Sequence, residues 1–361
     1  MAAEPALLNG IKVLDLSTVG PGSRCAALLA DLGAQVTKVQ PPEGSGRITP
    51  PAYAYSAGRA TTSVTLDLKH EEDHGRFLDL ARHSDVVLES FRPGVATRLN
   101  VDFTAVRSVN PMVIYVSLTG YGRTGPRSAW AGHDLNYQAV TGALYLQGRR
   151  ADGGPALPGA TFADSAGGGM HAALSICAAL VRRERTGTGA DLDVAAVDGI
   201  LSCMSLVIDE HLATDSAPSP GATLLTGQFA CYDVYRCADD RWISVAAIEA
   251  KFFTNLCALL GLTEHAKRQY QPDAQEEIRE DMRQVFATRP RDEWAARLAS
   301  HDTCVAPVLD IPEVADHLRE QARLVMVMTG DGRQFLQLEP VIAGSSTRQR
   351  SFQSTAGEDA T

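Results

Sequence analysis

The stretch IKVLDLSTVGPGSRCAALLADLGAQVTKVQPP, residues 11–42, decides the fold class. Its first seven residues are mostly apolar and predict a buried strand. A helix follows over residues 20–34, with a proline near its start and a glycine near its end, as helix boundaries favour. A second strand over residues 35–42 stops at two prolines, which cannot continue a sheet ladder.

The same alternation continues to about residue 200. Three further strands are expected, and an amphipathic helix separates the first two of them: 63–69, 85–91 and 112–120, with the helix at 70–84. Strands that alternate with helices indicate a parallel sheet covered by helices on both faces. We therefore expect an α/β fold for this part of the chain.

The alternating pattern of strands and helices ends near residue 214. A segment rich in Ser, Pro and Gly predicts a linker, and residues 232–247 read as two strands joined by a turn at 238–240, followed by helices. A late apolar segment, 335–344, is expected to return to the first domain. The sequence thus predicts a large domain over 1–214 and 326–361, a linker over 215–224 and a small α+β domain over 225–325.

Composition limits the classes of function. The chain has 361 residues, which favours two domains, and its net charge of −10 disfavours nucleic acid or an anionic membrane as a partner. The apolar run 199–208 is too short to span a bilayer, and the N-terminus shows no secretory pattern, so a cytoplasmic location is expected.

Seven scattered cysteines form no CxxC pair, so the sequence indicates neither a metal site nor a disulfide framework. Cys177 and Cys203 fall in apolar helical runs, where core packing is expected. The turn around Gly20 and Gly22 lacks the GxGxxG spacing of a dinucleotide site, so a tight strand-to-helix turn is the better interpretation.

Two segments hold residues suited to acid–base chemistry. In AGHDLNYQAV, 131–140, His133 and Asp134 begin a predicted helix. Each of the two could be a helix cap, a packed residue or a catalyst, and the sequence alone does not choose among these roles. Tyr137 fits a core position. In FADSAGGGM, 162–170, Asp164 precedes three glycines. Glycines weaken a helix by up to about 1 kcal/mol each, so we expect a close approach of a backbone or ligand there.

Several motifs together resemble the family III CoA-transferases. They include LNGIKVLDLSTVGPG, SVTLDLK, ESFRPGV, YVSLTGYGRTGP, GTGADLDVAAVDG and CYDVYRCADDRWISVAAIE, and they run over nearly the whole chain. Within that family, AGHDLNY combined with Asp164 and the AIE segment is most similar to the α-methylacyl-CoA racemases. The resemblance implies a Rossmann-like large domain built from both ends of the chain, and an interlocked homodimer.

The resemblance also assigns roles. His133 and Asp164 would be the two acid/base residues, with Asp134 beside His133 and Glu249 contributed by the partner's small domain. CoA phosphates would need cations: Arg92 matches a family position that contacts CoA, and Lys38 stands where relatives often carry Arg, while Lys69 and Arg47 are weaker candidates. Tyr137 is a further candidate for substrate or CoA binding. The segments 56–62 and 227–231 depart from the family pattern, around the nucleotide end and the acyl pocket.

The expected activity is that of a 2-methylacyl-CoA racemase or epimerase, which removes a proton from one face of C2 and returns one to the other. Histidine titrates near neutral pH, and a carboxylate does so when burial raises its pKa. No metal or redox cofactor is required, because CoA enters with the acyl substrate. Two alternatives stay open: a CoA-transferase with Asp164 as nucleophile, and an acyl-CoA-binding protein without turnover.

Overall fold

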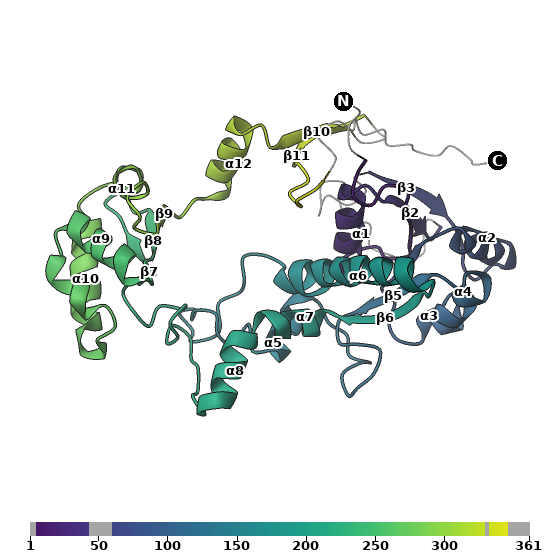
Figure 1. Ribbon diagram of the computed structural model, residues 1–361, viewed down its shortest axis with the longest axis horizontal. Coiled ribbons are helices and arrows are strands. Elements are labelled where there is room, and N and C mark those ends of the chain that lie inside the picture. Colours follow the sequence, from purple (N-terminus) through teal and green to yellow (C-terminus); the bar gives the residue numbers. More distant parts are fainter. Residues whose placement is uncertain (1–4, 43–59, 329–331, 346–361) are drawn as a thin grey trace. The chain divides into compact units, whose positions relative to one another are not determined.

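The computed structural model describes residues 5–42, 60–328 and 332–345, and the chain forms two compact units (Figure 1). Unit 1 holds the chain up to Leu144, Leu157–Asp209, and the chain from Gln321 onward; unit 2 combines Tyr145–Ala156 with Glu210–Glu320. Residues 145–156, expected in the large domain, belong to unit 2, and unit 2 begins again at Glu210 and ends at Glu320 rather than spanning 225–325. Each unit is described by itself.

Unit 1 is built on a six-stranded parallel sheet with the order β3-β2-β1-β4-β5-β6. The prediction of a parallel α/β sheet is confirmed, although the sequence analysis did not identify the strand that follows the long helix after Asp164. The strands are β1 (Lys12–Asp15), β2 (Gln35–Gln40), β3 (Thr61–Thr65), β4 (Val86–Glu89), β5 (Ile114–Thr119) and β6 (Ala190–Ala195).

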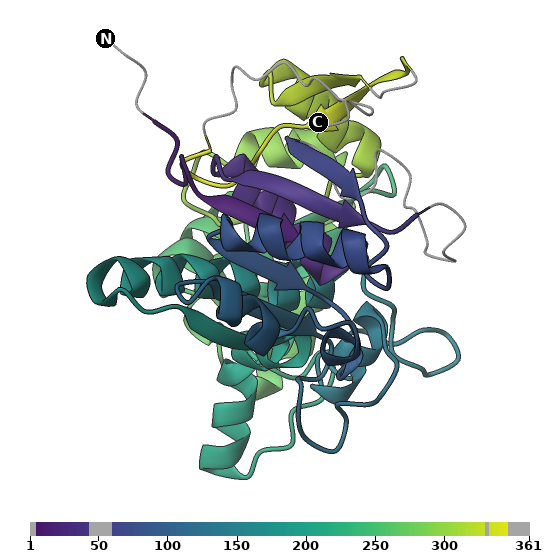
Figure 2. The same cartoon turned by 90° about the vertical axis from the view of Figure 1, so that its right-hand side faces the viewer.

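Helices cover both faces of this sheet (Figures 1 and 2). Successive strand residues point to opposite faces, so Val13 packs in the core formed with α1 and α6, and Leu14 packs in the core formed with α2, α3 and α4. The helical elements of unit 1 are α1 (Pro21–Asp31), α2 (Glu71–Arg82), α3 (Val95–Arg98), α4 (Phe103–Val109), α5 (Asp134–Val140), the π-helix η2 (Ala163–Met170), α6 (His171–Thr186) and α7 (Ala196–Cys203), and the residues of α8 (Ser205–Thr214) are divided between the two units.

Two details differ from the sequence-based expectation. The strand expected over 63–69 ends at Thr65, because Asp73 at the start of α2 accepts the backbone N–H of Asp67 at 2.8 Å and turns the chain into the helix. Cys203, expected in the core, is exposed: it is the last residue of α7, and the buried residues of this helix nearest to it, Gly199 and Ile200, lie one turn earlier.

The late apolar segment forms the second strand of a hairpin in unit 1. β10 (Leu324–Met328) and β11 (Gln334–Leu338) pair antiparallel. This segment belongs to the unit that holds the large sheet. In the described part of the chain, no helix has both the length and the apolar character needed to cross a bilayer.

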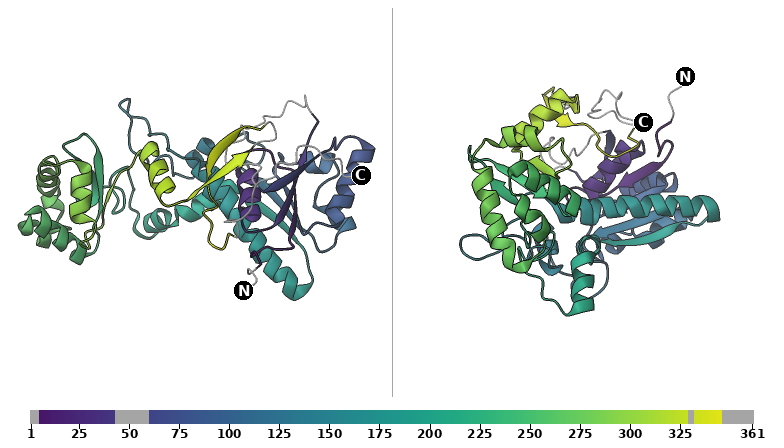
Figure 3. Two further views of the ribbon diagram at one scale, coloured as in Figure 1. Left: turned by 90° about the horizontal axis from the view of Figure 1, so that it is seen from above. Right: turned by 60° about the vertical axis from the view of Figure 1, so that its left-hand side comes forward.

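Unit 2 packs helices on a small antiparallel sheet of order β7-β8-β9, seen in green in Figure 3. The two strands expected over 232–247 are present, and Asp240 takes a left-handed conformation in the turn between them. The elements are β7 (Tyr232–Arg236), β8 (Trp242–Ala246), α9 (Ala250–Leu260), η3 (Thr263–Arg268), η4 (Pro272–Ala274), α10 (Gln275–Phe286), α11 (Arg291–Leu298), β9 (Val305–Pro307) and α12 (Ile311–Glu320).

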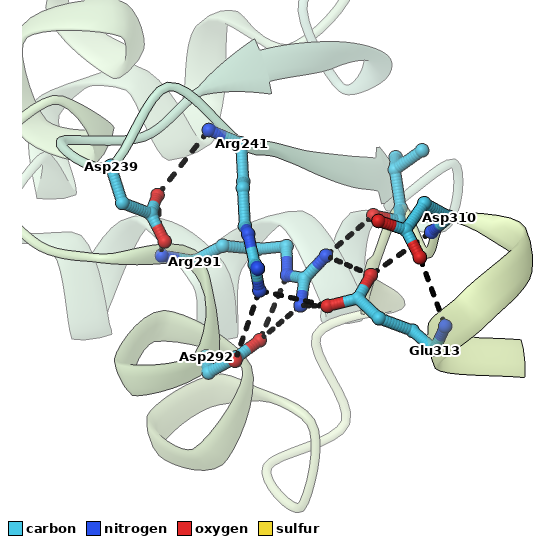
Figure 4. Close-up of polar contacts among 7 residues, drawn as sticks. Asp239, Arg241, Arg291, Asp292, Asp310 and Glu313 are labelled. Carbon is cyan, nitrogen blue, oxygen red and sulfur yellow. Dashed lines mark hydrogen bonds and ion pairs between the residues drawn. The ribbon is translucent and has the colours of Figure 1, made fainter. Parts of the chain in front are cut away.

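A buried arginine joins α11 to α12 within unit 2 (Figure 4). The guanidinium of Arg291 donates to both carboxylate oxygens of Glu313, at 2.9 and 2.6 Å, and to the carbonyl of Val308 at 2.8 Å. This forked pairing lowers the pKa of Glu313 to about 2. A charge that is buried with several partners is strongly held, so α12 begins at a fixed place beside the small sheet.

Candidate active site

A cavity lies beyond the carboxyl ends of the central strands of the large sheet. The chain runs from β1 to β2 on one side and later to β4 on the other, so β1 and β4 flank the switch point where α/β sheets bind ligands beyond their carboxyl ends. A cavity of about 450 Å³ lies there. It is lined by segments that follow β1, β4 and β5, and by the start of α5 and η2: residues 18–21, 90–93, 118–121, Ser128, 130–133, Asn136, Tyr137 and Asp164.

His133 is the N-cap residue of α5, so the expected helix start is present. Its backbone N–H donates to Oδ1 of Asn136 at 3.0 Å, and the backbone N–H of Asn136 donates back to the carbonyl of His133 at 2.8 Å. The imidazole is exposed and borders the cavity. The cap therefore uses the backbone of His133 and leaves its ring available.

Asp164 is the second residue of η2 and is only 9% exposed. π-helical turns are rare and are frequent at functional sites. The expected close approach around the glycines is present, and it is an approach of helices. A Cβ at Gly168 would lie 2.3 Å from Cβ of Pro21 in α1, and a Cβ at Gly199 in α7 would lie 2.0 Å from the carbonyl oxygen of Gly167. Close packing of α1 and α7 fixes the backbone that carries Asp164.

Asp134 joins the two helical starts. Its Oδ1 accepts the backbone N–H of Asp164 at 2.9 Å, and its Oδ2 accepts a hydrogen bond from Nε2 of Gln138 at 2.6 Å. Gln138 is almost fully buried and was not among the residues expected in the site. Its signal was the spacing, since residues four apart on a helix lie side by side.

The surroundings of Asp164 raise the pKa of its carboxyl group toward neutral pH. Burial and the nearby Asp134 carboxylate raise the pKa of Asp164 to about 6, against the opposing influence of His133 and Arg24. His133 is thus close enough to Asp164 to act on its charge. Both groups border the same cavity, so it holds a buried carboxyl group with a raised pKa and an imidazole.

Tyr137 is also in the site, held as a neutral phenol. Its hydroxyl donates to the carbonyl of Gly132 at 2.6 Å, and burial, followed by the charge of Asp164, raises its pKa to about 12. Tyr121 and Trp130, which the sequence analysis did not single out, line the cavity beside it. Their only sequence signal was proximity to the strand-and-glycine segment.

The candidate cations separate into two groups. Arg92 lines the cavity, on a turn that Glu89 holds by accepting the backbone N–H of Phe91 at 2.6 Å. Lys38 is instead buried beside Asp15, with 2.6 Å between the ammonium and the carboxylate. Lys69 is exposed and lies outside the cavity lining, and Arg47 lies outside the described residues. A CoA contact remains a prediction for each of them.

Glu249 is the N-cap residue of α9 in unit 2. Its expected place beside His133 involves both units and stays a prediction. In the described part of the chain, the cluster whose atoms suit a metal ion is Glu264, His265 and Asp281, also in unit 2. There Nε2 of His265 lies 2.7 Å from the Asp281 carboxylate, so a hydrogen-bond partner already occupies that ring nitrogen.

Comparison with known proteins gives one consistent family. The family model described as CoA-transferase family III matches residues 8–359. The chain is 36% identical over 318 residues to human alpha-methylacyl-CoA racemase, covering 88% of this chain and 81% of the relative. It is 31% identical over 340 residues to acetyl-CoA:oxalate CoA-transferase of Acetobacter aceti, covering 89% and 86%.

A solved structure supports the same grouping. The crystal structure of a CAIB/BAIF family protein from Brucella suis is similar with a TM-score of 0.77 at 28% identity, and the match covers 93% of this chain and 95% of that one. Relatives with racemase and with transferase names therefore match this chain at similar identity, and the family alone does not choose between the two reactions.

The raised pKa of Asp164 has a measurable consequence for stability. Between pH 4 and pH 6 the folded state binds more protons at this carboxyl than the unfolded state, so its contribution to stability falls as pH rises through that window. We expect Asp164→Asn to be more stable than the wild type by about 1–2 kcal/mol above pH 6, after allowance for solvent screening, with the gain vanishing toward pH 4.

Urea unfolding at a series of pH values measures this difference. Asp79→Asn is the matched control, because that carboxylate is 68% exposed and its loss should change stability by less than about 0.5 kcal/mol. An Asp164→Asn protein that is no more stable than the wild type at pH 8 would contradict the assigned environment.

Proposed function

The chain belongs to CoA-transferase family III, and on that premise we propose that it is a 2-methylacyl-CoA racemase that inverts C2 by proton transfer through an enolate. The observation that supports this proposal most is that His133 and Asp164 border one cavity. Inversion needs a base on one face of C2 and an acid on the other, and each must be able to take either role.

Asp164 suits this exchange of roles because its pKa of about 6 lies near neutral pH. Taking the proton from C2 moves negative charge to the thioester oxygen, which must then be stabilised. The first turn of α1 borders the cavity next to Asp164, and its N-cap Gly20 has no side chain to occupy the free N–H groups. Partial positive charge at that helix end would favour an enolate oxygen.

A CoA-transferase is the second candidate, supported by the similarity to the Acetobacter enzyme. In that reaction the carboxylate of Asp164 attacks the thioester carbonyl, forms a mixed anhydride and expels the CoA thiolate, which then attacks the aspartyl carbonyl and releases the acid. Such a carboxylate acts in its ionised form and needs no second base. The presence of His133 in the cavity favours the racemase.

The rest of the proposal follows from the resemblance and the cavity. CoA is bound as part of the substrate, with Arg92 near its phosphates, and the reaction needs no metal or redox cofactor. Two chains form an interlocked homodimer in the cytoplasm, and Glu249 of one chain supports His133 of the other. Exposed apolar side chains agree with a dimer: in α8, Leu206 and Leu212 are 64% and 73% exposed.

Proton exchange separates the two reactions. We expect incubation of either enantiomer of 2-methylbutanoyl-CoA in deuterium oxide to place deuterium at C2 and to give the racemate. Mass spectrometry measures the deuterium, and chiral analysis measures the ratio of the enantiomers. His133→Ala should lower exchange from one enantiomer at least a hundredfold, and Asp164→Asn should do so from the other, because each group acts on one face.

His83→Ala is the matched control for a lost imidazole, because His83 lies exposed before the start of β4, away from the carboxyl ends of the strands. Its exchange rates should equal those of the wild type. Absence of exchange together with a covalent CoA adduct on Asp164 would replace the racemase with the transferase. Tight CoA binding with neither reaction would indicate a binding protein.

The shared site can be tested by subunit mixing. Chains carrying His133→Ala and chains carrying Glu249→Gln should each exchange slowly, whereas their co-expression should restore exchange, since one site of the mixed dimer then combines an intact His133 with an intact Glu249. Mixed dimers without restored exchange, or a sedimentation coefficient of a single chain, would contradict the shared site.

A further inference from the structure

Three aromatic rings form one side of the cavity, and we call them the aromatic wall: Tyr121, Trp130 and Tyr137. Tyr121 meets Trp130 edge to face, with 5.9 Å between ring centroids, and meets Tyr137 in the same way at 5.1 Å. Contacts of this geometry are favourable beyond the burial of area. Trp130 is nevertheless 54% exposed, so much of the indole has no covering within the described residues.

The wall is fixed from behind. The ring of Tyr137 packs against backbone, since a Cβ at Gly120 or Gly132 would lie 2.3 or 2.8 Å from it. Tyr121 packs edge to face against the ring of Tyr137. The guanidinium of Arg127 lies 5.6 Å from the centroid of the Trp130 ring, a cation–π contact that restrains the indole further. An exposed ring held in this way loses little entropy when a ligand binds to it.

The position of Trp130 limits which part of an acyl-CoA it can touch. Trp130 precedes His133 by three residues, and an extended chain of that length spans about 10 Å at most. If His133 acts on the proton of C2, the indole lies within reach of the acyl chain. The nucleotide is separated from C2 by the pantetheine arm and lies farther along the ligand.

The charges in the cavity favour an apolar acyl group at the wall. Among the described residues that line the cavity, the ionisable side chains other than the two tyrosines are Arg92, His133 and Asp164. None of them belongs to the aromatic wall, and the hydroxyl of Tyr137 is already committed to the Gly132 carbonyl. Trp130 therefore presents a flat aromatic ring, with the guanidinium of Arg127 5.6 Å from its centroid.

We propose that Trp130 is a specificity-determining residue that binds the acyl chain beyond C2 and selects bulky apolar acyl groups, flat rings above all. The inference rests on the proposed function for the identity of the site, and it names the substrate class of that site. It assigns Trp130 to binding, with proton transfer left to His133 and Asp164.

Calorimetry with three ligands tests this assignment: free CoA, racemic 2-methylbutanoyl-CoA and racemic 2-methyl-3-phenylpropanoyl-CoA. We expect the wild type to bind the phenyl ligand most tightly. Trp130→Ala should lower the affinity for the phenyl ligand about tenfold, because an aromatic contact is lost. The affinity for free CoA should stay within about twofold of the wild-type value. Trp130→Phe should recover most of the loss, because a flat ring remains.

Trp242→Ala is the matched control, since that indole is 44% exposed on β8 in unit 2, and binding of all three ligands should be unchanged. An equal loss for all ligands in Trp130→Ala would assign the indole to CoA or to folding, and no loss for the phenyl ligand would remove it from the site; either result overturns the proposal. Deuterium exchange is measured separately. A wild type that binds the phenyl ligand most tightly but shows no exchange would contradict the racemase proposal and would leave the proposed binding role of Trp130 standing.

Discussion

One carboxylate joins the two halves of the candidate site. Asp134 accepts the backbone N–H of Asp164 through one oxygen and the amide of the buried Gln138 through the other, at 2.9 and 2.6 Å. The first bond ties η2 to α5, and so holds Asp164 near His133. The second fixes the rotamer of Asp134 itself. Because the same carboxylate stands next to Asp164, its negative charge also helps to raise the pKa of that group.

The surrounding fold keeps this arrangement rigid. Three elements meet at η2, and they approach so closely that glycine is required where they touch, at Gly168 against Pro21 and at Gly199 against the Gly167 carbonyl. A dense interior leaves little space for a helix to shift. The position of Asp164 is therefore set by helix packing, whereas His133 is set by the backbone hydrogen bonds of a helix cap.

Sequence patterns predicted the scaffold because its physics is local. Apolar runs and the Pro–Gly boundaries of 11–42 specify strand, helix and strand, and those elements fix the direction of the sheet. The start of α5 at His133 follows from the same kind of signal. The joining of η2 to α5 could not be predicted, since the bond between Asp134 and Asp164 spans 30 residues. The spacing of four residues puts Gln138 beside Asp134, but it does not show that Gln138 is buried, and sequence does not show the ring contacts of Trp130. The ion pair of Lys38 could not be predicted either, because the register of β1 and β2 places Asp15 beside it; its contact with CoA stays a prediction.

The central claim is that burial and Asp134 give Asp164 an acid strength suited to exchanging protons with carbon. Carbon-13 NMR of the Asp164 carboxyl, followed through a pH titration, measures it directly. The account predicts a midpoint near pH 6 in the wild type and a lower midpoint in Asp134→Asn, which removes the neighbouring charge. A wild-type midpoint at the ordinary aspartate value, about pH 4, would contradict it.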